Sequence, residues 1–187
     1  ADAAKATYAY ANYEHLLGTV PNEVVLIYNP ESMAAGYNEG IDRSVGDVLI
    51  FSHDDIEFLQ DDFAGTIERH LRSVDVLGVG GADDLTHANW ISAGKGHLFG
   101  QVAHPHEGVF IVCRYGTDPV LAADCMVIDG CWMCAKREVV ESIRFDHATF
   151  TGFHCYDLDF SLRAHLARYR VGVASDLFPI HQSGGTY

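Results

Sequence analysis

Three side chains that can bind a metal ion follow directly after a short apolar run of the sequence. The run is VLIF at residues 48–51, and His53, Asp54 and Asp55 come just behind it. A continuous apolar run predicts a strand that is buried on both faces, and in open α/β sheets ligands bind beyond the carboxyl ends of such strands. Alternate residues of an extended segment point the same way, so His53 and Asp55 can share one target. Imidazole and carboxylate together suit Mn²⁺ or Mg²⁺. The alternative interpretation is a solvated turn that caps the next helix.

A second pair of carboxylates, Asp157 and Asp159, stands where a helix is expected to begin. Leu158, Leu162 and Leu166 recur every four residues and predict one apolar face of that helix. Acidic side chains are favourable in the first turn of a helix. From the residues alone, the alternative therefore stays open that Asp157 is a helix cap and Asp159 a solvated acid.

The charge of the chain narrows the classes of partner that it can bind. Of its 187 residues, 26 are Asp or Glu and 12 are Lys or Arg, which gives a formal net charge of −14. Binding to nucleic acid needs clustered basic side chains that neutralise phosphates, and anionic membranes make the same demand, so both classes are excluded. If the ligand is a phosphate ester, a divalent cation is the obvious group to neutralise it. Hydrophobic residues make up 48% of the chain, which excludes wholesale disorder, and the length suits one domain.

Several features favour a cytoplasmic protein. No apolar stretch reaches the 18 residues of a transmembrane segment, and residues 1–10 lack the charged head and apolar run of a signal peptide. The five cysteines are an odd number, which argues against a disulfide scaffold. Cys131 and Cys134 form a C-x-x-C pair ahead of a predicted helix. A redox or zinc role for this pair is an alternative that we set aside, because unpaired cysteines are commonly buried.

The first half of the chain alternates between strand and helix patterns, which is typical of an α/β domain with a parallel sheet. Apolar runs predict strands, and apolar residues four apart predict helices. The predicted elements, in order, are a strand at 24–28 (VVLIY), a helix at about 32–43, a strand at 48–51, a helix through Phe63, Ile67 and Leu71, and a strand at 74–79.

The second half has a different character. Residues 82–108 are rich in Gly, His and Asp, which predicts mostly loop, and loops of this length are usually functional or mobile. Further elements are then expected in this order: strands at 109–113 and 126–128, a strand at 131–135 that leads into a helix at 136–142, a helix from about 157, and a strand at 171–174.

Four motifs in the right order resemble the family 2-like glycosyltransferases. The first is ESMAAGYNEG at residues 31–40, followed by the strand and the H-x-D sequence at 53–55, as in a bacterial subgroup that reads SMAxxYNEG and then H-x-D. The others are Asp129-Gly130 with residues 136–138 and 145–146, then FHCYDLDFSLR at 153–163, and PIHQSGG at 179–185. The resemblance covers roughly residues 24–185.

The resemblance implies a GT-A fold, a three-layer sandwich with a mostly parallel central sheet and a smaller acceptor-side subdomain. The whole chain, 1–187, is then a single domain, with residues 1–81 forming the nucleotide-sugar-binding half and 82–187 the acceptor-binding half. The family's first strand and helix precede the strand at residue 24, and here only 23 residues are available. Residues 8–17 look like the tail of that helix, so we expect the first strand to be missing. The alternative is a shortened first strand at 7–11.

The resemblance also implies a metal site that holds the diphosphate of a nucleotide-sugar donor. The family usually has Asp-x-Asp at the strand end, and here His53 takes the first position, which leaves Asp55 as the surest ligand. His181 matches a late histidine that completes the metal site, with Mn²⁺ or Mg²⁺ as the cofactor. Asp54 and Asn38 are expected near the donor. The metal would act as a Lewis acid that stabilises the leaving diphosphate.

By the same resemblance, Asp157 aligns with the general base of inverting members, which takes the proton of the acceptor hydroxyl. The family usually has Glu one place earlier, where this chain has Tyr156. Asp159, Trp90 and Trp132 are candidates for the acceptor site, because aromatic faces suit stacking on sugar rings; both tryptophans could equally be core residues.

The predicted function is that of an inverting, metal-dependent hexosyltransferase. Its acceptor would be a glycan, a lipid-linked sugar or a small molecule. The alternatives are a metal-dependent phosphohydrolase or nucleotidyltransferase that uses the same His and Asp residues, and a non-catalytic nucleotide- or sugar-binding domain.

Overall fold

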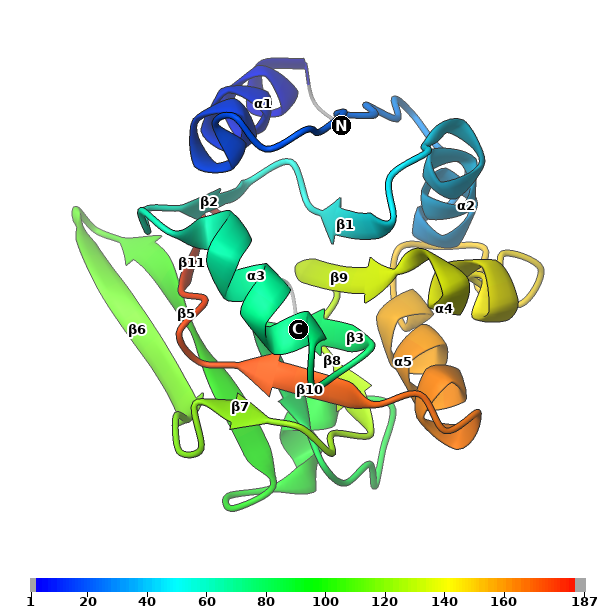
Figure 1. The fold of residues 1–187 in the computed structure, drawn as a ribbon. Helices are drawn as coiled ribbons and strands as arrows, with labels where there is room; N and C mark the ends of the chain where they lie inside the picture. Colours follow the sequence, from blue (N-terminus) through cyan, green and yellow to red (C-terminus); the bar gives the residue numbers. More distant parts are fainter. Residues whose placement is uncertain (1–2, 184–187) are drawn as a thin grey trace.

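The computed structural model describes residues 3–183, which form two β-sheets and five α-helices (Figure 1). In Figure 1, α2, α4 and α5 lie on the right and α1 and α3 on the left, with β1 and β9 between them. The helices are α1 (Ala3–Leu17), α2 (Met33–Arg43), α3 (Phe63–Leu71), α4 (Arg137–Ile143) and α5 (Tyr156–Leu166), and a short 3₁₀ helix, η1, spans Trp90–Ala93. None of the described helices is both long enough and apolar enough to cross a lipid bilayer.

Sheet A is the central layer of the fold, and most of its strands run antiparallel. Its strand order is β1-β9-β3-β10-β7, and only β3 and β10 pair in parallel. The strands are β1 (Val48–Ser52), β9 (Trp132–Lys136), β3 (Val76–Gly78), β10 (Val171–Ala174) and β7 (Leu121–Ala122).

Sheet B carries a long hairpin at one side of the molecule. Its strand order is β2-β11-β5-β4-β8, β6 pairs with β5, and only β5 and β11 run in parallel. The strands are β2 (Ile56–Phe58), β11 (Pro179–His181), β5 (Leu98–His106), β4 (Gly80–Ala82), β8 (Val127–Ile128) and β6 (Val109–Gly116).

The prediction of a mostly parallel sheet is therefore wrong, although the α/β class is right. An apolar run shows that a strand is buried on both faces, but it does not show in which direction the neighbouring strand runs. β9 comes from the second half of the chain and lies between β1 and β3, antiparallel to both. Each sheet thus contains strands from both halves of the sequence.

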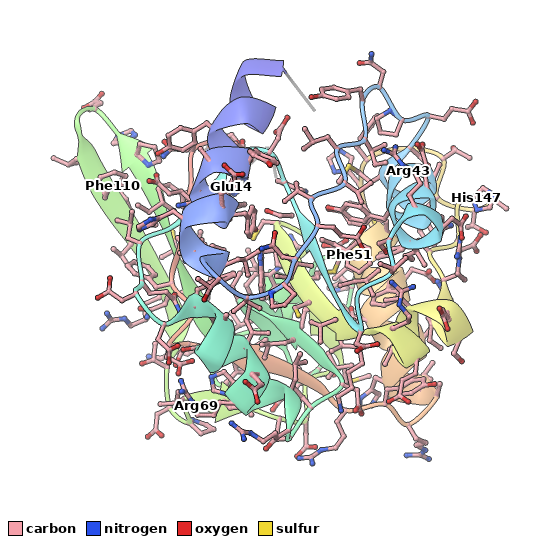
Figure 2. The ribbon with its side chains drawn as sticks, turned by 45° about the horizontal axis from the view of Figure 1, so that its top comes forward. Glu14, Arg43, Phe51, Arg69, Phe110 and His147 are labelled. Atoms are coloured by element: carbon pink, nitrogen blue, oxygen red, sulfur yellow. The ribbon has the colours of Figure 1, made fainter. Side chains whose placement is uncertain are left out.

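Two apolar clusters hold the layers together. On one face of sheet A, α2, α4 and α5 pack on β1, β9 and β10; Phe51 (labelled in Figure 2) packs from β1 against Tyr37 and Phe145, with ring centroids 5.0 and 5.1 Å away. On the other face, α1 and α3 pack on β3 and β9, with Phe63 fully buried. Burial of such side chains stabilises the fold by about 1.5–3 kcal/mol each.

The helices of the first half follow the predicted apolar spacing. In α2, the Ser32 hydroxyl accepts a hydrogen bond from the Ala35 N–H at 3.1 Å, so Ser32 caps the helix. Ile41 of α2 is buried against sheet A. α3 buries Phe63, Ile67 and Leu71, the three residues whose spacing predicts it.

Two expectations differ from the structure. In both, the outcome depends on whether a distant strand pairs with the segment, and the local sequence does not show this. Residues 24–28 are not a strand: the described residues place no strand beside them, and Tyr28 is 51% exposed. Residues 82–108 follow the loop prediction only in part: 83–89 and 94–97 are loop, whereas η1 spans Trp90–Ala93 and β5 occupies 98–106 through its pairing with β4, β6 and β11. Gly100 has a φ of +99° at a bulge in β5, where it lies against the Val79 carbonyl, and the left-handed backbone there favours glycine.

At the start of the described chain, the structure has a helix and no strand. α1 covers residues 8–17, as expected for the helix, and it also covers 7–11, where the shortened strand was the alternative. In the described residues, no strand precedes β1.

Candidate functional site

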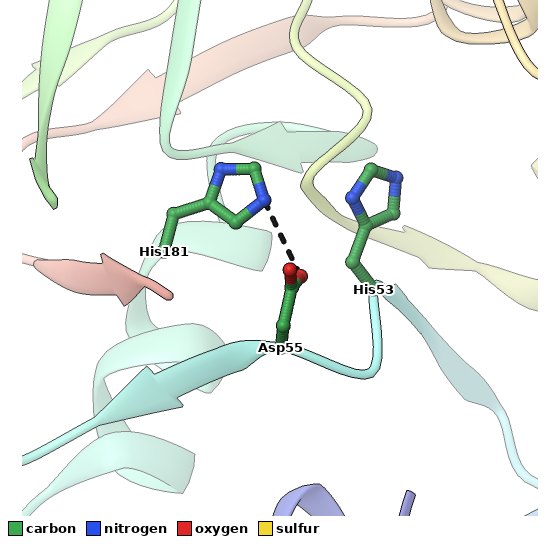
Figure 3. Close-up of side chains that lie close together, drawn as sticks. All are labelled: His53, Asp55 and His181. Carbon is green, nitrogen blue, oxygen red and sulfur yellow. Dashed lines mark ion pairs between the residues drawn. The ribbon is translucent and has the colours of Figure 1, made fainter. Parts of the chain in front are cut away.

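Two histidines and an aspartate meet where three segments of sheets A and B come together (Figure 3). His53 follows β1, Asp55 precedes β2, and His181 ends β11. β2 and β11 pair antiparallel with His181 opposite Ile56, which brings Asp55 and His181 together. The His181 Nε2 atom lies 3.3 Å from the Asp55 Oδ1 atom. We call His53, Asp55 and His181 the histidine cluster.

The donor set of the histidine cluster fits a divalent transition metal. One ligand atom from each residue can be chosen so that all lie within 4.8 Å of one another, and small side-chain rotations bring such atoms around one ion. The side chains of His181 and Asp55 are only 12% and 7% exposed, so few waters compete for them. Burial, and the neighbouring His181, lower the pKa of His53. A neutral imidazole is the form that binds metal.

Tyr156 fixes the orientation of the His53 ring. Its hydroxyl lies 2.9 Å from the His53 Nε2 atom and donates to the Gly130 carbonyl at 3.2 Å. Where the phenol proton goes to the carbonyl, the hydroxyl oxygen accepts the Nε2–H of His53. The Nδ1 atom of His53, which points toward Asp55 and His181 in Figure 3, then keeps a free lone pair.

Asp157 lies beside this arrangement at the start of α5. Its Oδ2 atom accepts a hydrogen bond from the Gly130 N–H at 2.7 Å, and the side chain is partly buried. Burial, together with the negative charge of Asp129, raises the pKa of Asp157 to about 6. A carboxylate with such a pKa is ionised at neutral pH and still basic enough to take a proton.

Gly130 is the residue that joins these two side chains. A Cβ atom at this position would collide with the Tyr156 hydroxyl and would lie 2.8 Å from the Asp157 Cβ atom. Its backbone N–H and C=O also bind Asp157 and Tyr156, respectively. The sequence marked Asp129-Gly130 as a motif but suggested no role for either residue, because the contacts join positions far apart in the chain.

Asp129 connects the site to the long segment before β5. Its two carboxylate oxygens accept hydrogen bonds from the Cys131 N–H and the Trp90 Nε1–H, both at 2.9 Å. Trp90 is 6% exposed and packs edge-on against Tyr115. Trp90 therefore stands beside the candidate site, with most of its ring covered.

Two other candidates, Asn38 and Asp159, have contacts of a structural kind. Both ends of the Asn38 amide bind the backbone of Phe145, at 2.8 and 3.0 Å, so Asn38 ties α2 to the segment after α4. Asp159 pairs with Arg163, which also donates to the carbonyls of Ile143 and Arg144. We call Asn38, Asp159 and Arg163 the clamp. The structure does not bring the clamp and the histidine cluster together.

Trp132 and Asp54 have opposite surroundings. Trp132 is fully buried against Phe58 and Phe63, so no face of its ring is available to a sugar, and it is a core residue. Asp54 is partly exposed in the turn between β1 and β2 and lines a cavity beside β1. It is thus accessible to a ligand that lies next to the histidine cluster.

The C-x-x-C pair lies in the core. Cys131 and Cys134 are both free and buried, and burial raises the pKa of each thiol well above its usual value. A thiol in such surroundings is a poor nucleophile and a poor metal ligand, which argues against a redox or zinc role.

Comparison with known proteins identifies one family. The sequence model described as "Glycosyltransferase like family" matches residues 6–184. Among solved structures, the crystal structure of A197 from STIV is similar, with a TM-score of 0.48 and 14% sequence identity; the match covers 92% of this chain and 87% of that one. No curated protein matches the sequence.

Proposed function

The chain belongs to this glycosyltransferase-like family, and we propose that it is an inverting, metal-dependent enzyme that moves a sugar from a nucleotide-sugar to an acceptor hydroxyl. One observation carries the proposal: the histidine cluster is connected through Tyr156 and Gly130 to Asp157. The residues that would hold a metal ion, and through it a diphosphate, are thus linked by hydrogen bonds to Asp157, a carboxylate that can take a proton.

His53 Nδ1, an Asp55 carboxylate oxygen and a ring nitrogen of His181 are the atoms that would hold the ion. A metal ion, when bound there, supplies positive charge for the oxygens of the diphosphate. Two imidazole nitrogens favour Mn²⁺ over Mg²⁺, since Mg²⁺ prefers an all-oxygen shell. The net charge of −14 supports this view, because the carboxylates of Asp54, Asp55 and Asp157 would repel a diphosphate that is not neutralised by a cation.

Asp157 would act as the general base. The acceptor oxygen attacks the anomeric carbon of the donor, and the bond from that carbon to the diphosphate oxygen breaks, with its electron pair leaving on the nucleoside diphosphate. The acceptor proton passes to a carboxylate oxygen of Asp157 during the attack. Attack from the face opposite the leaving group inverts the configuration. The Gly130 N–H holds Oδ2 of Asp157, so the carboxylate is oriented before the acceptor arrives.

The acceptor would bind on the side of Asp157 and Asp129. Trp90 stands there and is fixed through its Nε1–H on Asp129. Because Trp90 is only 6% exposed, it would shape the acceptor side mainly by holding Asp129 in place, whereas Asp159 is engaged with Arg163 and contributes to the position of α5.

A panel of nucleotide-sugars tests the proposal. Because a ligand that binds the native state raises its stability, the right donor should raise the melting temperature, and more so with Mn²⁺. The same donor should then support sugar transfer that Asp157→Asn abolishes. Release of phosphate without any acceptor would favour a phosphohydrolase instead, and donor binding without turnover would favour a non-catalytic binding domain.

A further inference from the structure

A third histidine, His104, lies next to the histidine cluster on the strand beside β11. β5 and β11 run in parallel and pair at Ala103 and Ile180 (Figure 1), so the residues that follow, His104 and His181, are neighbours across the sheet. The ring centroids of His104 and His181 are 5.6 Å apart, and those of His53 and His181 are 5.7 Å apart. His181 therefore has an imidazole neighbour on two different segments of the chain.

These ring distances suit imidazoles that bind one metal ion. With a bond of about 2.1 Å from each nitrogen to the ion, two such rings have their centroids about 5–6 Å apart. Both pairs fall in this range. The pair of His104 and His181 thus has the spacing of the pair that already belongs to the histidine cluster.

Ser183, two residues after His181, contacts both of the neighbouring rings. Its hydroxyl oxygen lies 3.1 Å from the His181 Nε2 atom, and its carbonyl oxygen lies 3.4 Å from the His104 Nδ1 atom. A carbonyl oxygen can only accept, so where this contact is a hydrogen bond the proton is on Nδ1, and Nε2 of His104 keeps its lone pair. Histidines that bind metals are held in this way, with one ring nitrogen on a carbonyl and the other on the ion.

The His104 ring has room to approach the ion. The three residues whose ligand atoms already lie within 4.8 Å of one another do not include His104, so its ring must turn about the side-chain bonds to join them. The side chain is only partly buried, and side chains with exposed atoms change rotamer rapidly.

A further imidazole also suits the charge and the coordination of the site. It is neutral, so it adds no negative charge beside Asp54 and Asp55. Four protein ligands leave a six-coordinate ion two positions, as many as two oxygens of one diphosphate occupy. Three imidazoles with one carboxylate favour Mn²⁺ over Mg²⁺ more strongly than two imidazoles do.

We propose that His104 is a fourth ligand of the ion and binds it through Nε2. The proposal rests on the proposed function, because it concerns the ion that the histidine cluster would hold. It makes the β5–β6 hairpin, on which Figure 2 labels Phe110, part of the metal site. The motif HPH at residues 104–106 then has a role that its sequence alone did not suggest.

Titration of His104→Ala with Mn²⁺, followed by electron paramagnetic resonance, tests the proposal. Loss of a residue that only orients a ligand lowers metal affinity about 10- to 100-fold, so loss of a ligand itself should lower it at least about tenfold. His106→Ala is the matched control, because it removes a histidine of the same strand two residues nearer the hairpin turn, and it should keep the affinity. An unchanged affinity in His104→Ala, or an equal loss in both variants, would overturn the proposal.

Pulsed electron paramagnetic resonance with ¹⁵N-labelled histidine separates ligation from an indirect role. The unchanged protein with Mn²⁺ should show three coordinated imidazole nitrogens, and His104→Ala should show two. Two in the unchanged protein would overturn the proposal even if the variant binds Mn²⁺ more weakly, because His104 would then act from outside the coordination shell. Since the unchanged protein alone decides this point, the test stands even if the variant does not fold.

Comparison of Mn²⁺ with Mg²⁺ gives a further test. Removal of an imidazole should weaken Mn²⁺ binding more than Mg²⁺ binding, so the ratio of the two affinities should fall in His104→Ala; an unchanged ratio would contradict the proposal. Its failure differs from failure of the proposed function. Mn²⁺ held by the histidine cluster alone would overturn only the role of His104, whereas absence of Mn²⁺ binding in the unchanged protein would overturn the metal dependence itself.

Discussion

The histidine cluster with Asp157, and the clamp formed by Asn38, Asp159 and Arg163, are both polar clusters, and the sequence proposes all of their residues except Arg163 as parts of the site. In the clamp, the side-chain groups bind other parts of the protein: Asn38 binds Phe145 twice, and Arg163 binds Asp159 and two carbonyls. In the histidine cluster, three potential metal ligands offer atoms that lie within 4.8 Å of one another, and beside it the Gly130 N–H binds the Oδ2 atom of Asp157. The difference teaches that polar character alone does not mark a candidate site; the convergence of ligand atoms on one point does.

Asp157→Asn should have the largest effect. It tests the group that we assign to chemistry, the histidine cluster with Asp157. An amide can keep a hydrogen-bond contact with Gly130, but it cannot take a proton, so the rate of transfer should fall roughly 10²- to 10⁴-fold. The rate is measured with the donor that the thermal screen selects. Asp159→Asn is the matched control, because it changes an acid of the same helix that belongs to the clamp. A similar loss of rate in both variants would contradict the distinction.

Tyr156→Phe should have the next largest effect. The variant removes only the hydroxyl that orients His53, so Mn²⁺ affinity should fall about 10- to 100-fold, as for other residues that position metal ligands. Calorimetric titration measures the affinity, and ¹⁵N NMR of the His53 ring should show that the Nε2–H tautomer is no longer favoured. An unchanged tautomer and affinity would show that the hydroxyl does not orient the ligand.

Asn38→Ala tests whether the clamp stabilises the fold and takes no part in the chemistry. It leaves the buried N–H and C=O of Phe145 without their partner, so the free energy of unfolding should fall by about 1–3 kcal/mol. Mn²⁺ affinity and the rate constant of transfer should stay near those of the unchanged protein below the melting temperature. Urea denaturation measures the stability; a loss of metal affinity with no loss of stability would place Asn38 in the donor site after all.

The pH dependence gives the smallest expected effect. The pKa of Asp157 is raised to about 6, so the base is protonated below that pH and ionised above it. The rate of transfer should therefore rise with pH through about 6. Asp129→Asn removes a neighbouring negative charge, which lowers the pKa of Asp157 and should move the rise to lower pH. A pH–rate profile of the two proteins measures the shift; a rise at the same pH in both would mean that Asp129 does not act on the base.

Local patterns predicted the parts of the fold that local interactions decide. The spacing of Phe63, Ile67 and Leu71 predicts α3, and the run at residues 48–51 predicts β1. In both cases a few neighbouring residues contain the whole signal: the apolar face of a short helix, or the apolar run of a short strand. The direction of the strands was not predictable in this way, since β9 (Trp132–Lys136) comes from the second half of the chain and pairs with β1 in the first half. The prediction of a strand at residues 24–28 was wrong for the same reason. Their β propensity is clear, but a strand forms only where a second strand pairs with it.

For the site, the sequence found the candidate metal ligands but not the residues that orient them. The alternation of His53 and Asp55 and the resemblance at His181 name three residues that the structure brings together. Tyr156 and Gly130 gave no such signal, because their contacts join β1, the segment before β9, and α5. Trp132 was misleading, since its residue type suits both a sugar platform and a core, and only packing decides between them.

Titration of the protein with Mn²⁺, followed by electron paramagnetic resonance, tests the central claim most directly. The account predicts about one bound ion per chain, lost in Asp55→Ala, weakened in His181→Ala and retained in Asp157→Asn, because Asp157 belongs to the base and not to the ligands. Absence of Mn²⁺ binding in the unchanged protein, or binding that Asp55→Ala leaves intact, would contradict it.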